Sequence, residues 1–164
     1  MTHSSIAVAN EFLKLSVRDS IPVTPMKLQK LVYYAQGWHL GVMDSPLVSE
    51  PVECWAYGPV FRKLYGVTKS FGGDSVHGPL TNKDRSTADM DCKEGDESLK
   101  LVQRVWDSYK QYSAERLSNM THSEDSPWKR VRNVYKAYEP PAGTDIPVEY
   151  IKEHFTKLSS QGQQ

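Results

Sequence analysis

The stretch from residue 24 to residue 43 constrains the fold of this chain more than any other. The Thr24 hydroxyl can accept a hydrogen bond from an amide of a first helical turn, and Pro25 stands where its missing N–H costs nothing. Tyr33 and Tyr34 add large aromatic contact area. Apolar residues recur on one face at helical spacing, namely Leu28, Leu31, Val32, Ala35, Trp38 and Val42. We therefore expect one long central helix whose apolar face is covered by other elements.

The totals fit one domain over residues 1–164, with a core from about residue 5 to residue 158. Equal numbers of basic and acidic residues, 20 of each, create no net field, so nucleic acid is not an expected partner. No apolar run approaches the roughly 18 residues of a membrane span, and no signal peptide opens the chain, so we expect no membrane partner. Cys54 and Cys92 lie outside any C-x-x-C pattern, which favours a reducing cytoplasm.

Helical patterns also occur on both sides of the central helix. Ser113 and Ser126 are suitable N-caps for two short helices, the second with Pro127 in its first turn. The other predicted helices span residues 5–17, 59–71, 98–112 and about 147–158. The sequence thus predicts a mainly α fold, a single compact domain of six or seven helices around the central aromatic helix.

Two stretches do not follow a helical pattern. Residues 52–58 alternate large and small side chains, so we expect a short extended segment ending at Gly58, followed by a helix with Pro59 in its first turn. The fold allows a small two-stranded β element around residues 47–57. Residues 74–97 hold few apolar side chains and are predicted to form a mobile polar loop, and residues 159–164 a disordered tail.

No motif indicates a cofactor, a metal site or catalysis. H-E-x-x-H, G-x-S-x-G, P-loop and G-x-G-x-x-G patterns are all absent from the sequence. His39 and His122 are expected to hydrogen-bond loop carbonyls, and Cys54 beside Trp55 to be a buried, inert thiol. We therefore do not expect an enzyme.

Four basic residues follow Trp128, and a helix places them largely on the solvent side of its apolar stripe: Lys129, Arg130, Arg132 and Lys136. Glu124 and Asp125 precede the same helix and partly cancel this charge. A solvated helix face explains the cluster better than a nucleic-acid site does.

The chain holds more amphipathic aromatic residues than a small core needs. Tyr, Trp and Arg are the residues that most often anchor protein interfaces, which favours a binding module over a catalyst. The candidates for binding a partner are Tyr34, Trp55, Tyr57, Arg62 and Tyr65. The sequence does not indicate an oligomeric state.

Residues 26–39, 53–60 and 117–129 together resemble the Panacea domain, the SocA-like (phage-associated GepA-like) antitoxin family. The first segment reads MKLQKLVYYAQGWH, the second ECWAYGPV and the third LSNMTHSEDSPWK. Cys54 stands where the family often has a small residue such as Ala. The motif residues that we expect to be structural are Leu28, Leu31, Tyr33, Trp38, Gly58, Pro59, His122, Pro127 and Trp128.

This resemblance implies a mostly helical antitoxin of a type II toxin-antitoxin system, often carried on a prophage, whose partner is a protein toxin encoded by the adjacent gene. Family members neutralise unrelated toxins by direct contact, so we expect stoichiometric binding. One alternative is an adaptor that delivers the toxin to a AAA+ protease. A less favoured alternative is a hydrolytic enzyme that uses His122.

Overall fold

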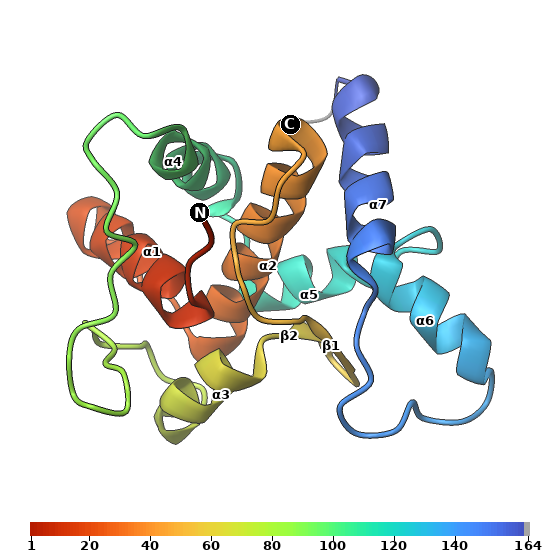
Figure 1. Ribbon diagram of the computed structural model, residues 1–164. Helices are drawn as coiled ribbons and strands as arrows, with labels where there is room; N and C mark the ends of the chain where they lie inside the picture. Colours follow the sequence, from red (N-terminus) through yellow and green to blue (C-terminus); the bar gives the residue numbers. More distant parts are fainter. Residues whose placement is uncertain (163–164) are drawn as a thin grey trace.

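The computed structural model describes residues 1–162 and has seven α-helices and one β-hairpin within them (Figure 1). This confirms the predicted mainly α architecture. The elements in chain order are α1 Ser5–Asp19, α2 Pro25–Met43, β1 Glu53–Trp55, β2 Gly58–Val60, α3 Arg62–Thr68 with a 3₁₀ turn Lys69–Phe71, α4 Glu97–Tyr109, α5 Ala114–Met120, α6 Pro127–Tyr135 and α7 Val148–Ser160.

Helix α2 is the centre of the fold. It lies between α1 and α4 on one side and α7 on the other (Figure 1), and 14 of its 19 residues are buried. A Cβ atom on Gly37 would lie 2.1 Å from the Phe155 ring of α7, so glycine permits this close approach. The sequence predicted one buried face, but burial extends around most of the helix. Val42, which the sequence assigned to the buried stripe, is 51% exposed.

Buried polar side chains of α2 bind the backbone of the segments that cross it. Oε1 of Gln36 accepts hydrogen bonds from the amides of Leu47 and Val48, both at 2.8 Å. Nδ1 of His39 lies 2.6 Å from the carbonyl oxygen of Ser45, which confirms the carbonyl contact predicted for this histidine. These bonds satisfy backbone groups that would otherwise be buried without partners.

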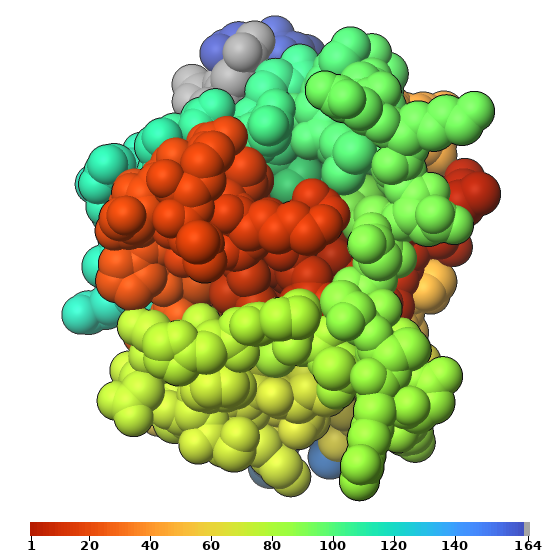
Figure 2. All heavy atoms as spheres, turned by 90° about the vertical axis from the view of Figure 1, so that its left-hand side faces the viewer, coloured from red at the N-terminus to blue at the C-terminus, as the bar shows by residue number. Residues whose placement is uncertain are grey.

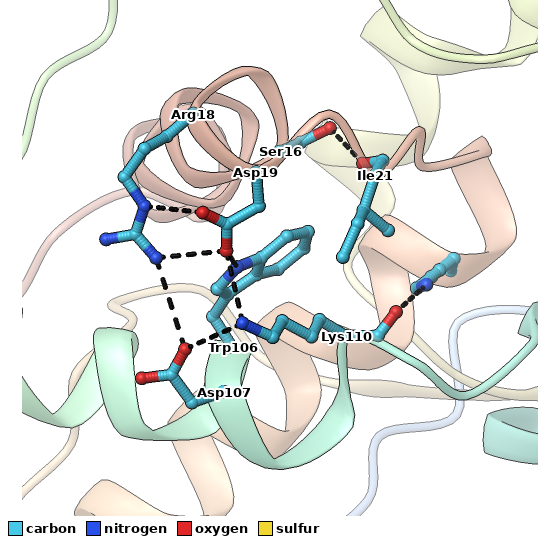
Figure 3. Close-up of polar contacts among 8 residues, drawn as sticks. Ser16, Arg18, Asp19, Ile21, Trp106, Asp107 and Lys110 are labelled. Atoms are coloured by element: carbon cyan, nitrogen blue, oxygen red, sulfur yellow. Dashed lines mark hydrogen bonds and ion pairs between the residues drawn. The ribbon is translucent and has the colours of Figure 1, made fainter.

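A network of polar side chains joins the end of α1 to α4 (Figure 3). Oδ2 of Asp19 accepts hydrogen bonds from the Trp106 indole at 2.8 Å and from Lys110 at 3.2 Å. The Arg18 guanidinium donates to Oδ1 at 2.8 Å. The Arg18 contact, followed by the Trp106 contact, holds the pKa of Asp19 well below its usual range. We call these four residues the α1–α4 junction.

The long loop between the 3₁₀ turn and α4 packs along α1 (Figure 2). The amide of Asn10 on α1 donates to the carbonyl oxygens of Leu80 at 2.9 Å and Ala88 at 2.8 Å, and its oxygen accepts from the Leu80 amide. Val76 and Met90 are buried as well. The loop has no helix, as predicted, but its few apolar residues reach the core. Its mobility stays a prediction.

Residues 53–60 form an antiparallel hairpin in which Glu53 pairs with Val60 and Trp55 with Gly58. The two-stranded element therefore exists, but Pro59 lies in β2 and not in a helix, which corrects the sequence prediction. Gly58 has a φ of +119°, a conformation that favours glycine and turns the chain back onto β1. Helix α3 begins only at Arg62.

The C-terminal helix extends further than the sequence predicted. Ser159 and Ser160 belong to α7, although the predicted disordered tail began at residue 159. Residues 163–164 of that tail lie outside the described part of the chain.

Candidate protein-binding surface

Four of the five predicted partner-binding residues meet on the hairpin and α3. The rings of Trp55 and Tyr65 pack edge to face with centroids 4.8 Å apart, and the Arg62 guanidinium lies 5.5 Å from the Trp55 ring centroid. Tyr57 occupies the turn between the strands. We call Trp55, Tyr57, Arg62 and Tyr65 the hairpin patch.

The hairpin patch is open to solvent. Tyr57 is 71% exposed, Tyr65 is 42% exposed and the Arg62 side chain is 59% exposed, while Trp55 is half-buried. An aromatic surface of this kind at a loop tip is typical of a binding site for another protein.

Tyr34 does not belong to the hairpin patch. Only 5% of its surface is exposed, and its ring stacks on Tyr109 of α4 with centroids 4.5 Å apart. The Tyr34 side chain therefore fills the core, because α2 is buried on more than one face. Burial in this structure corrects the expectation that Tyr34 is presented to a partner.

An ion pair fixes the orientation of Arg62. Its Nε and one terminal nitrogen donate to the two carboxylate oxygens of Glu53 at 2.9 and 2.8 Å, and the Trp55 indole donates to the same carboxylate at 3.0 Å. Hydrogen bonds from Arg62 lower the pKa of Glu53, so its carboxylate is charged at neutral pH. This network holds two patch side chains in one geometry.

The backbone of the hairpin is held from three sides. The Ser118 hydroxyl of α5 donates to the carbonyl oxygen of Tyr57 at 2.8 Å, and the Trp128 indole of α6 donates to that of Trp55 at 2.6 Å. The Cys54 amide donates to the carbonyl oxygen of Thr144 in the segment before α7. Because these hydrogen-bond partners come from distant parts of the sequence, the hairpin is fixed by tertiary structure and not by local turn preference alone.

Helix α2 supports the hairpin from beneath. The Gln29 side chain accepts from the Phe61 amide at 2.9 Å and donates to its carbonyl oxygen at 3.0 Å. The Lys30 ammonium donates to the carbonyl oxygen of Pro59 at 3.1 Å. Sequence analysis missed Gln29, Lys30 and Ser118, because a polar residue on a helix gives no periodic signal that it is buried.

His122 lies behind the hairpin with its ring stacked on Trp128, centroids 3.9 Å apart. Its Nε2 is buried and has no hydrogen-bond partner among residues 1–162. Burial lowers the pKa of His122, so the ring is neutral at pH 7. A backbone hydrogen bond to Tyr57, in the turn of the hairpin, opposes this lowering, which agrees with the predicted bond to a loop carbonyl.

The remaining motif residues are mostly core residues. Leu28 and Leu31 have no exposed surface, and Tyr33, Trp38 and Trp128 are at most 8% exposed. Cys54 is buried as predicted, and desolvation raises the pKa of its thiol to about 11, so it is protonated and inert at neutral pH. Pro127 begins α6 as predicted, with Ser126 as its cap.

Two of the four basic residues that follow Trp128 are occupied by contacts within the chain. Arg130 pairs with Glu153 at 3.0 Å and covers the Tyr150 ring, and Arg132 donates to Glu139 at 2.9 Å. These pairs fit the solvated-face interpretation of this cluster.

The described surface also has grooves that lie away from the hairpin patch. One, of about 340 Å³, runs between α2, α4 and α7 and is lined by Trp38, Leu101, Val105 and Tyr109 with Arg104 at its rim. No set of three His, Cys, Asp or Glu side chains within residues 1–162 is arranged to hold a metal ion. Among those residues, no helix has the length and apolar character needed to cross a membrane.

Comparisons with known proteins identify the family of this chain. The profile of the family described as "Antitoxin SocA-like, Panacea domain" matches residues 28–129, which include most of α2, the hairpin, α3, α4, α5 and the start of α6. The chain is 29% identical over 136 residues to Antitoxin SocA of Caulobacter vibrioides (strain NA1000 / CB15N), covering 77% of this chain and 69% of that protein. No solved structure gives a significant match. Since the family profile spans well over half of the sequence, this chain belongs to the SocA-like, Panacea-domain antitoxin family.

Proposed function

We propose that this protein is the antitoxin of a type II toxin-antitoxin pair and neutralises its toxin by direct, one-to-one binding through the hairpin patch. Its membership of the SocA-like family supports an antitoxin role. The adjacent gene would encode the toxin.

The observation that carries this proposal is the exposure of Tyr57 in the hairpin turn and of Arg62 and Tyr65 on α3. Tyr, Trp and Arg dominate the residues whose truncation weakens protein interfaces. Side chains that are already ordered lose less conformational entropy on binding, which leaves more of the contact energy as affinity. The patch residues do not line the α2–α4–α7 groove, and an exposed aromatic surface suits a protein partner better than a small molecule.

The first experiment is co-expression with the polypeptide encoded by the adjacent open reading frame. We expect growth to be restored, a complex to co-purify, and calorimetric titration to give one antitoxin per toxin. Continued growth arrest without a complex would contradict the proposal.

Stoichiometry and turnover separate the alternatives. An enzyme would neutralise at substoichiometric amounts, whereas an adaptor would shorten the half-life of the toxin in cells that contain the protease. Direct masking leaves toxin half-life unchanged in cells that contain the protease, neutralises equally well in a protease-deficient strain, and requires equimolar protein.

A matched pair of arginine variants then tests which surface binds the toxin. Arg62→Ala removes a patch residue, and Arg104→Ala removes an exposed arginine at the rim of the α2–α4–α7 groove. We expect Arg62→Ala to weaken binding about tenfold and Arg104→Ala to leave it unchanged. If Arg104→Ala weakened binding and Arg62→Ala did not, the groove and not the hairpin patch would be the binding surface.

A further inference from the structure

Helix α2 buries two lysines one turn apart, and the two act on different parts of the fold. Lys27 is 7% exposed and donates to the carbonyl oxygen of Lys110 at the end of α4 at 2.5 Å. Lys30 is 2% exposed and donates to the carbonyl oxygen of Pro59 in the hairpin. Within residues 1–162, neither ammonium forms an ion pair with a carboxylate.

A buried amine without a carboxylate costs stability. Desolvation lowers the pKa of Lys30 to about 8, because the interior disfavours its charged form. An apolar side chain of the same length would fill this space without that penalty. Lys30 therefore does not serve stability, and its role lies in the backbone segment that its ammonium binds.

The Lys30 ammonium lies directly beneath the hairpin turn. A Cβ atom built on Gly58 would lie 3.0 Å from Lys30 Nζ and 2.8 Å from the Thr121 hydroxyl, so these two groups close the space under the turn. Pro59 has no N–H, which removes one backbone donor from β2. The bond from Lys30 to the Pro59 carbonyl ties the backbone of β2 directly to a buried side chain of α2.

We propose that Lys30 is a positioning residue for partner binding: its ammonium fixes Gly58 and Pro59 and so presents Trp55 and Tyr57 in the geometry that the toxin recognises. This inference rests on the proposed function. Lys30 itself does not contact the partner, because it lies in the interior beneath the hairpin.

The first test needs no partner and compares Lys30→Met with Lys27→Met by hydrogen exchange and thermal unfolding. In Lys30→Met we expect amide exchange in residues 53–61 to rise at least tenfold, with a melting temperature equal to or above that of the wild type. Lys27→Met should leave exchange in this segment unchanged. Unchanged exchange in Lys30→Met, or loss of cooperative folding, would overturn the inference.

The second test is a double-mutant cycle on affinity for the polypeptide encoded by the adjacent open reading frame. Lys30→Met should weaken binding about tenfold in the wild type and by less than twofold in a Tyr57→Ala background, because Lys30 acts through the hairpin. Lys27→Met should not weaken it. An equal loss in both backgrounds, or no loss in either, would overturn the positioning role.

Failures of the two proposals are distinguishable. If the wild-type protein forms no complex with that polypeptide, the proposed function is wrong and the binding role of Lys30 is wrong with it. If the wild-type complex forms and Lys30→Met binds normally, only the role of Lys30 is wrong.

Discussion

The α1–α4 junction and the underside of the hairpin differ in how many partners they offer a charged side chain. At the junction, the Asp19 carboxylate accepts hydrogen bonds from Arg18, Trp106 and Lys110. Beneath the hairpin, the Lys30 ammonium has one backbone acceptor and, within residues 1–162, no carboxylate partner. In the same region, Nε2 of His122 has no partner within the described residues.

This difference separates the part of the molecule that stabilises the fold from the part that we assign to binding. Saturated networks add stability, whereas a buried polar group with few partners subtracts from it. Proteins accept such costs mainly at functional sites. The comparison therefore predicts that substitutions at the junction change unfolding, and that substitutions at the hairpin change recognition.

The largest effect should come from Trp106→Ala. This side chain is fully buried, so its removal leaves a cavity and takes one donor from Asp19. We expect the free energy of unfolding to fall by about 3–5 kcal/mol, measured by urea denaturation. Toxin affinity of the protein that remains folded should be unchanged. A large loss of affinity at full folding would break the distinction between the two regions.

Gly58→Ala should affect both stability and binding. Its φ of +119° strains any other residue, and the added Cβ meets the Thr121 hydroxyl at 2.8 Å. We expect a loss of about 2 kcal/mol in unfolding free energy together with weaker toxin binding. As a control, Gly66→Ala adds a Cβ in open space within α3. It should be neutral or stabilising, and equal losses at Gly58 and Gly66 would contradict the assignment of strain to the turn.

Tyr57→Ala should sharpen the contrast, because it acts on recognition alone. The side chain is 71% exposed, so unfolding free energy should change by no more than about 0.5 kcal/mol. Toxin binding should weaken by about 2 kcal/mol, roughly 30-fold in the dissociation constant. Calorimetric titration and a thermal melt of the same preparation measure both. Equal losses of binding and of unfolding free energy would show that Tyr57 stabilises the fold and is not specific to binding.

The smallest effect is a pH dependence caused by Lys30. Its pKa is about 8 in the folded protein against 10.5 for the free group, so the unfolded chain binds more protons between these values. Stability must therefore rise with pH across this window. Between pH 7 and pH 9 the wild type should gain about 1 kcal/mol relative to Lys30→Met. Cys54, whose raised pKa acts in the opposite direction at higher pH, is present in both proteins. If the difference in unfolding free energy between wild type and Lys30→Met stayed constant from pH 7 to pH 9, Lys30 would not be desolvated.

Helix caps and apolar spacing predicted the helices well, because both signals depend only on residues close together in the sequence. Thr24, Ser113 and Ser126 cap helices as expected, each accepting a hydrogen bond from an amide in the first turn. The register of the hairpin was missed, since a proline after glycine also fits the first turn of a helix. The structure shows that Gly58 instead pairs with Trp55.

Contacts between distant segments explain the remaining differences. Nothing in a single sequence shows that Asn10 binds the backbone of residues 80 and 88, which anchors a loop whose composition is polar. The exposure of the hairpin patch residues also cannot be read from a single sequence. The residue types Trp, Tyr and Arg predicted an interface, but only the fold separates exposed Tyr57 from buried Tyr34.

The most direct test of the account is a hydrogen-exchange footprint of the complex with the polypeptide encoded by the adjacent gene. We expect new protection in residues 53–65, which contain the hairpin patch, and little change in residues 97–109 of α4. Protection confined to α4 and the end of α7, with the hairpin as exposed as in the free protein, would contradict the claim that the hairpin patch binds the toxin.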